Sequence, residues 1–166
     1  MATYTFYVKV QSVGGSNKYF IDSVQQDSLD LGHDITYKFD QSDSSNAVPS
    51  SHPLRFSTTS DGTHNSGSEY TTNVTTNGSP GSAGAYTQIA VTSSTAATLY
   101  YYCSAHSGMG GSIATTADEF TSTALGLKKP VLGNATDTWG AYINQTADVV
   151  DQELAGQATS LAIALG

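Results

Sequence analysis

The sequence predicts a mainly β protein: a Greek-key β-sandwich over residues 1–115, a linker over 116–136 and a C-terminal α-helix over 137–166. Short runs that alternate apolar and polar residues recur along the first two thirds of the chain, separated by turns rich in Gly, Ser, Thr and Asn. Ten Tyr and five Phe can supply a core for such a sandwich. Towards the C-terminus apolar residues recur at spacings of three and four, which is the period of a helix.

The strand candidates are short, and most alternate in hydropathy or are rich in β-branched and aromatic residues. In chain order they span 3–10, 18–23, 28–31, 34–40, 52–58, 86–91, 98–103 and 112–115. Pro53 lies near the start of the fifth candidate, where its missing N–H costs least. The polar stretches 40–51 and 59–83 are expected to be loops. Several short strands with turns at regular intervals are typical of a β-sandwich.

Composition excludes several classes of function. The formal net charge is −8, and an acidic chain repels phosphate backbones, so nucleic-acid binding is not expected. No apolar run is long enough to span a membrane, so membrane insertion is not expected either. The sequence contains no paired carboxylates, nucleophile motif or phosphate-binding loop, which predicts a protein that is not an enzyme. Because Cys103 is the single cysteine, an intrachain disulfide is impossible.

A metal-ligand pattern follows the strand candidate 98–103. Cys103 ends that strand, His106 follows three residues later, and Met109 follows after three more. A blue copper site takes two imidazoles and one thiolate in a trigonal plane, with a long axial thioether. His52, at the start of a distant strand candidate, is the best source of the second imidazole. Each residue alone is better explained as a buried thiol, a loop cap or a core side chain, but the four together favour a metal site.

This order of residues resembles the cupredoxins, or blue copper proteins. In that family a lone His precedes a Cys-x-x-His-x-x-Met cluster that follows an aromatic-rich strand, as it does here after Tyr100-Tyr101-Tyr102. The loop is as short as that of the amicyanins. The resemblance implies one copper ion in a type 1-like site, with imidazoles from His52 and His106, the thiolate of Cys103 and a weak axial bond from Met109.

Two positions depart from the family pattern. Pro53 stands where family members often carry an Asn that braces the cysteine loop, and Ala105 stands where many carry Pro. Since such neighbours orient and tune the ligands, these departures predict a site that binds copper without being a tuned redox centre. The remaining histidines, His33 and His64, do not fit the pattern and are expected to be exposed loop residues.

The C-terminal region has the pattern of a self-associating helix. Thr136 or Asp137 is a suitable N-cap. A narrow apolar stripe suits packing between helices, and Gly156 makes an isolated helix marginal. We therefore expect copies of the chain to associate through this stripe. Its candidate oligomerisation residues are Trp139, Ile143, Ala147, Val150, Leu154 and Leu161.

Residues 127–144 contain the pattern K-P-x-x-G-x-x-x-D-T-W-G-x-x-x-N. It resembles a segment of tail-fibre and related virion proteins of bacteriophages. The resemblance implies a homotrimer packed around Trp139, with other virion proteins and the host cell surface as partners. No signal-peptide pattern precedes the first strand candidate, which favours a fibre-like or capsid/tail decoration protein assembled in the host cytoplasm. The alternative is a small blue copper electron-transfer protein, monomeric and periplasmic or extracellular.

The helical stripe gives a first testable prediction. Leu154→Asp should dissociate the oligomer, because it places a charge in the apolar seam. The molar mass in solution, measured by light scattering, should fall to that of one chain. Gln152→Asp, which lies off the stripe, is the matched control and should keep the oligomer. An unchanged mass for Leu154→Asp would show that the seam does not hold the copies together.

Overall fold

The computed structural model describes residues 2–116, 120–121 and 128–129. Residues 1–116 form one compact unit. The short strands β11 (Phe120–Thr121) and β12 (Lys128–Lys129) pair antiparallel within the predicted linker. The predicted helix 137–166, with all the candidate oligomerisation residues, lies outside the described residues. Within the described part, no helix is long and apolar enough to cross a membrane.

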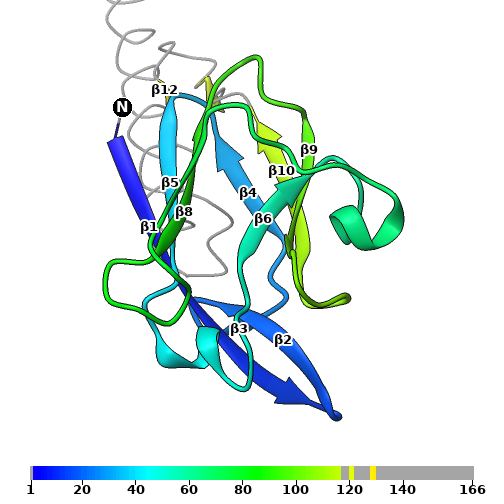
Figure 1. The fold of residues 1–166 in the computed structure, drawn as a ribbon. Helices are drawn as coiled ribbons and strands as arrows, with labels where there is room; N and C mark the ends of the chain where they lie inside the picture. The colour runs from blue at the N-terminus through cyan, green and yellow to red at the C-terminus, as the bar shows by residue number, and fades with distance from the viewer. Residues whose placement is uncertain (1, 117–119, 122–127, 130–166) are drawn as a thin grey trace, which may run out of the picture. The chain divides into compact units, whose positions relative to one another are not determined.

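The compact unit is mainly β, as the sequence predicts, and two sheets make up most of it (Figure 1). One sheet has the order β3-β2-β1-β5-β8-β7, and the other has the order β4-β10-β9-β6. Two 3-10 turns, η1 (Ser44–Ala47) and η2 (Gly62–Asn65), lie in the connections. The strands are β1 (Ala2–Val13), β2 (Ser16–Ile21), β3 (Val24–Gln25), β4 (Leu29–Gly32), β5 (Ile35–Asp40), β6 (Leu54–Ser57), β7 (Val74–Asn77), β8 (Tyr86–Val91), β9 (Thr98–Cys103) and β10 (Gly111–Thr116).

Within residues 2–116, two strands are absent from the sequence prediction. β3 has two residues, both exposed, so it leaves no apolar periodicity to detect. β7 lies inside the stretch 59–83, for which the sequence predicts a loop, and it pairs with β8 at the edge of the larger sheet. Only Val74 of β7 packs against the core, while its other three residues are exposed. An edge strand with one apolar anchor has the composition of a loop.

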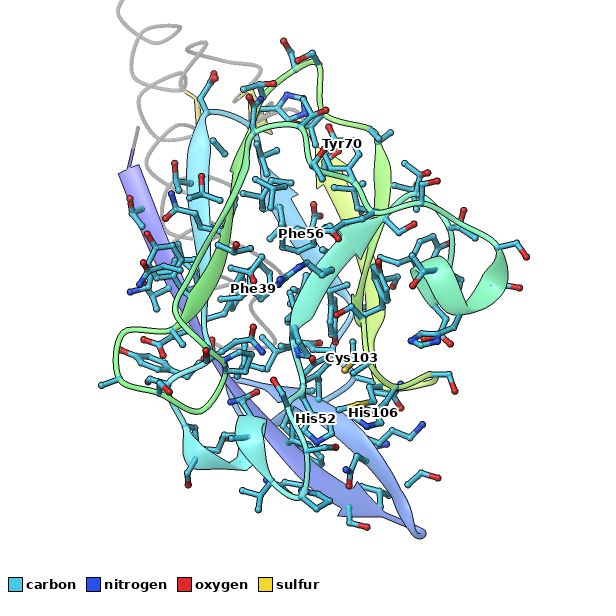
Figure 2. All side chains as sticks on the ribbon, in the orientation of Figure 1. Phe39, His52, Phe56, Tyr70, Cys103 and His106 are labelled. Carbon is cyan, nitrogen blue, oxygen red and sulfur yellow. The ribbon has the colours of Figure 1, made fainter. Side chains whose placement is uncertain are left out.

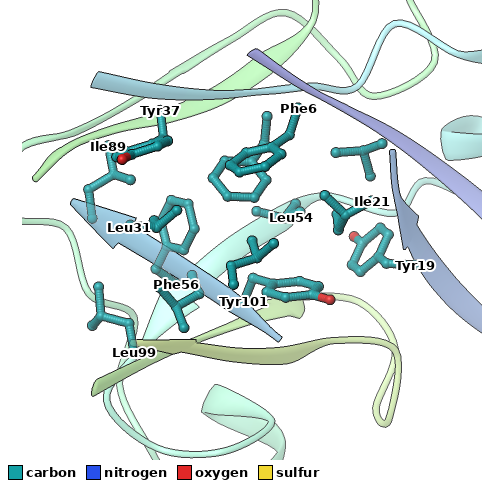
Figure 3. Close-up of a cluster of buried hydrophobic side chains, with 14 of the residues drawn as sticks. Phe6, Tyr19, Ile21, Leu31, Tyr37, Leu54, Phe56, Ile89, Leu99 and Tyr101 are labelled. Atoms are coloured by element: carbon teal, nitrogen blue, oxygen red, sulfur yellow. The ribbon is translucent and has the colours of Figure 1, made fainter. Parts of the chain in front are cut away.

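The core lies between the two sheets, where aromatic rings from both meet (Figure 3). Phe39 of β5 and Phe56 of β6 make an edge-to-face contact, with ring centroids 5.3 Å apart. Tyr101 of β9 lies 6.4 Å from Phe39 by the same measure. Such pairs favour offset or edge-on geometry over a face-to-face sandwich. These three rings therefore tie the larger sheet to the two strands that lead to the predicted metal ligands.

The pairing of β6 with β9 brings two of those ligands together. Leu54 opposes Cys103 in the antiparallel register. His52 stands two residues before Leu54, so it lies just beyond the last pair of the ladder, beside the end of β9. The pairing of β6 with β9 thus brings His52, from the middle of the chain, next to the single cysteine.

Phe39 gives a prediction about the core. Phe39→Ala should lower the free energy of unfolding by about 3–5 kcal/mol, because the side chain is fully buried and its loss leaves a cavity. Tyr7 lies on the neighbouring strand β1, and its side chain is 63% exposed. Tyr7→Ala should therefore change the free energy of unfolding by no more than about 0.5 kcal/mol. Urea unfolding would measure both. Equal effects would contradict the assignment of Phe39 to the core.

Candidate metal centre

Three of the four sequence-predicted ligands converge at one end of the sheets (Figure 2). The Sγ atom of Cys103 lies 3.9 Å from Nδ1 of His52 and 3.6 Å from Nδ1 of His106. One donor atom from each residue lies within 4.8 Å of the others, and the imidazole centroids are 4.6 Å apart. His52 and Cys103 are fully buried, whereas His106 is partly exposed. The cluster therefore presents one sulfur and two nitrogens to a common point.

These distances suit a single metal ion. Metal–nitrogen bonds of about 2.0 Å and metal–sulfur bonds of about 2.3 Å, at tetrahedral or trigonal angles, place S and N ligands about 3.5–3.7 Å apart. The two sulfur–nitrogen separations at Cys103 agree with that spacing to within a few tenths of an ångström. The donor set consists of borderline and soft ligands, and this three-residue cluster contains no carboxylate.

Polar groups from three separate segments of the chain fix the backbone of His52. Its carbonyl accepts hydrogen bonds from the Tyr19 hydroxyl and the Gln41 side-chain amide, both at 2.8 Å. Its N–H donates to the Asn46 carbonyl at 2.8 Å. Gln41 also accepts from the N–H of Leu54 at 3.1 Å. Because these groups hold the backbone of His52, its ring can be aimed at Cys103 without help from a metal.

The Cys103 end of the site is braced through Pro53, the first departure from the family pattern. The Ser104 N–H donates to the Pro53 carbonyl at 3.0 Å. A main-chain carbonyl thus makes a link between the two ligand segments. On the far side of the loop, Gly110 approaches β9 so closely that a Cβ would lie 1.7 Å from the Tyr101 carbonyl oxygen. Only glycine allows the chain to turn back there into β10.

The outer nitrogens of both imidazoles have polar neighbours. His106 Nε2 lies 3.1 Å from the Ser50 hydroxyl, and His52 Nε2 lies 3.4 Å from the Asn17 side-chain amide. When a metal occupies Nδ1, Nε2 carries the proton and must donate it. The Ser50 oxygen can accept that proton directly, and Asn17 can accept it after its amide flips to present the oxygen.

Met109, the fourth predicted ligand, is 1% exposed. Its carbonyl accepts a hydrogen bond from the Tyr19 N–H at 3.0 Å. Its side chain belongs to the core and also lines an open hollow of about 650 Å³ that includes His106, Asn17 and His64. Met109 is therefore beside the cluster, and axial coordination by its sulfur stays a prediction.

The other two histidines differ in part from the expectation of exposed loop residues. His33 is half-buried. His64 is exposed, as predicted, yet its Nε2 lies 2.9 Å from the Cys103 carbonyl oxygen and its ring stands edge-on to Tyr102. Nothing in the polar stretch around His64 indicates this contact, because it depends on how the long connection folds back over β9.

Burial sets the protonation of two groups at the site. It lowers the pKa of His52, and the neighbouring His106 lowers that pKa further. It also raises the pKa of the Tyr19 phenol well above its usual value, and Cys103 adds to that effect. The neutral form of His52, which is the form that binds a metal, is thus favoured, and Tyr19 donates a hydrogen bond to the His52 carbonyl.

Comparison with known proteins adds no identification. No family model matches the chain, and no curated protein is significantly similar to it.

The lowered pKa of His52 predicts a pH-dependent stability of the metal-free protein. In the unfolded chain His52 takes up a proton near pH 6.5. In the folded chain His52 takes up that proton only at a lower pH, because its pKa is lowered. The stability that comes from burying His52 in its neutral form is fully present above about pH 6.5. It decreases as the pH falls, and it is lost below the pKa of His52 in the folded state. Urea unfolding at pH 7 and pH 5 with a chelator should show a smaller pH dependence for His52→Gln than for wild type. His33→Gln is the control, and equal dependence in wild type and His52→Gln would contradict the assignment.

Proposed function

We propose that residues 1–115 are a cupredoxin-like Greek-key β-sandwich that binds one copper ion in a type 1-like site. The observation that carries this proposal is the convergence of His52, Cys103 and His106 at metal-ligand spacing. His52 and His106 would bind through Nδ1, Cys103 through its thiolate, and Met109 through a weak axial bond.

Copper is favoured over zinc by the fourth donor. Structural zinc sites take four Cys, His or carboxylate ligands. Here the fourth donor in the pattern is a thioether, which is a soft ligand suited to Cu(I), and two imidazoles with one thiolate complete the set of a blue copper site. When bound, copper would supply a one-electron redox couple and would add its binding free energy to folding.

We further propose that the chain is a bacteriophage virion protein, fibre-like or a capsid/tail decoration component, and not an enzyme. The support is the resemblance of residues 127–144 to phage fibre segments and the apolar stripe that follows it. Residues 137–166 would form the trimeric stem, and residues 1–115 would be displayed towards other virion proteins or the host surface. In that setting the metal would chiefly stiffen the displayed domain.

A blue copper electron carrier is the second candidate. The observation that favours it is the partial exposure of His106 beside the open hollow, since an exposed ligand edge shortens the path to a partner. This hypothesis requires a monomer in the periplasm or outside the cell. It assigns no role to the apolar stripe of residues 137–166.

The copper proposal predicts a spectroscopic result. One equivalent of Cu(II) should produce an intense thiolate-to-copper charge-transfer band, because Cys103 would donate its sulfur to the ion. Cys103→Ser should abolish the band. Met109→Leu should keep it at a shifted energy, because the axial ligand tunes such sites. His33→Gln should leave it unchanged.

The same titration separates the alternatives. Absence of the band from the wild-type protein, together with tight binding of Zn(II), would replace copper by a structural zinc ion. Absence of binding by either metal would refute the metal site. A band with a reversible redox couple in a monomer would favour the electron carrier over the virion protein.

A further inference from the structure

The loop from Cys103 to Met109, which carries three of the four predicted metal ligands, is called the ligand loop below. A single short segment that contains none of the predicted ligands holds both ends of this loop. Both carboxylate oxygens of Asp61 accept the Gly108 N–H, at 2.9 and 3.0 Å. His64, three residues later, places Nε2 2.9 Å from the Cys103 carbonyl oxygen, where an N–H can donate. Cys103 begins the ligand loop and Gly108 precedes Met109. The segment 61–65 therefore contacts the loop on both sides of His106.

This segment is itself fixed on the outer side of β9 (Figure 1). Tyr102 alternates with the core residue Tyr101, so its ring faces outward and is covered by η2. A Cβ on Gly62 would lie 2.4 Å from that ring, and Gly62 has a φ of +53°. The Gly62 carbonyl accepts the Gly67 N–H at 2.9 Å, which closes the turn. Tyr102 is fully buried as a result.

The Gly108 peptide is also held on its other side. Its carbonyl accepts a hydrogen bond from Lys18 Nζ. The Gln26 side-chain amide donates to the Gly110 carbonyl at 2.6 Å. The ligand loop is built almost entirely of small residues, which offer little side-chain surface to pack. Polar contacts to its backbone are therefore what fixes its shape.

We propose that Asp61 and His64 are positioning residues, which hold the loop from Cys103 to Met109 in its ligand geometry before a metal arrives. Preorganisation of this kind strengthens binding, because the cost of ordering the loop is met during folding. The part of the inference that concerns metal affinity rests on the proposed metal site. The part that concerns the order of the metal-free loop does not.

His64 should also affect the sulfur. It donates to the carbonyl of the residue that carries the thiolate, and groups around a metal-bound Cys sulfur tune its electronic properties. A variant that loses this donor should shift the energy of the charge-transfer band. A residue that served only to stabilise the fold would not do so.

The first test compares Asp61→Ala and His64→Ala with wild type in the full chain. Amide hydrogen exchange at residues 105–109 should accelerate in the metal-free variants, and affinity for Cu(II), measured by competition with a chelator, should fall about 10–100-fold. His64→Gln keeps an N–H donor and should restore most of the loss. Asp22→Ala is the matched control, because its carboxylate accepts the Tyr7 N–H at 2.8 Å outside the ligand loop.

The outcomes separate the inference from the proposed function. If both Ala variants match Asp22→Ala in loop exchange and copper affinity, Asp61 and His64 do not position the loop. If wild type binds no metal, the proposed function fails, and loop exchange alone decides the inference. If Asp61→Ala also loses protection in the core strands, His64→Ala decides the test. Faster loop exchange in His64→Ala than in Asp22→Ala would support the inference, and equal exchange would overturn it.

Discussion

The antiparallel register between β6 and β9 is the constraint on which the candidate metal centre depends. Leu54 opposes Cys103, and this pairing sets His52 beside the sulfur although the two residues are 51 positions apart in the chain. A slip of one residue would turn every side chain of β9 to the other face, so Cys103 would leave the core side and Tyr102 would enter it. The packing of Phe39 against Phe56 and Tyr101 opposes that slip, because each ring fits only one face of its strand.

A buried polar network extends this register to His52. Gln41 and Asn46 are almost fully buried, and their side chains are occupied by the backbone of His52, Leu54 and Val8. Such a network destabilises the fold if a buried polar group stays unpaired. It makes the surrounding structure more rigid when every group is paired. It explains how His52, which precedes β6 and lies outside the ladder, is held in place.

Sequence alone predicts what a side-chain pattern can encode. Alternation reveals most of the strands, and the spacing of Cys103, His106 and Met109 identifies the ligand loop. Backbone contacts leave no such pattern: the Pro53 carbonyl that holds Ser104 has no side-chain signature. The contact of His64 with Cys103 escapes prediction for a related reason, since a polar loop gives no indication of where it folds back. The predicted stem lies outside the described residues.

The metal-free centre has a physical reason to bind an ion. A buried sulfur faces two imidazole nitrogens at 3.6 and 3.9 Å, distances at which a thiol makes only weak hydrogen bonds. Burial disfavours charging His52, and a positive charge on His106 would disfavour it further. The fold thus brings together donor atoms that satisfy one another poorly, and it holds them there through contacts to the backbone. A metal ion would replace those weak contacts with coordinate bonds, and its binding free energy would become folding free energy. If the cluster binds a metal ion as proposed, the stability of this domain should depend on that ion whether the protein transfers electrons or only supports a particle.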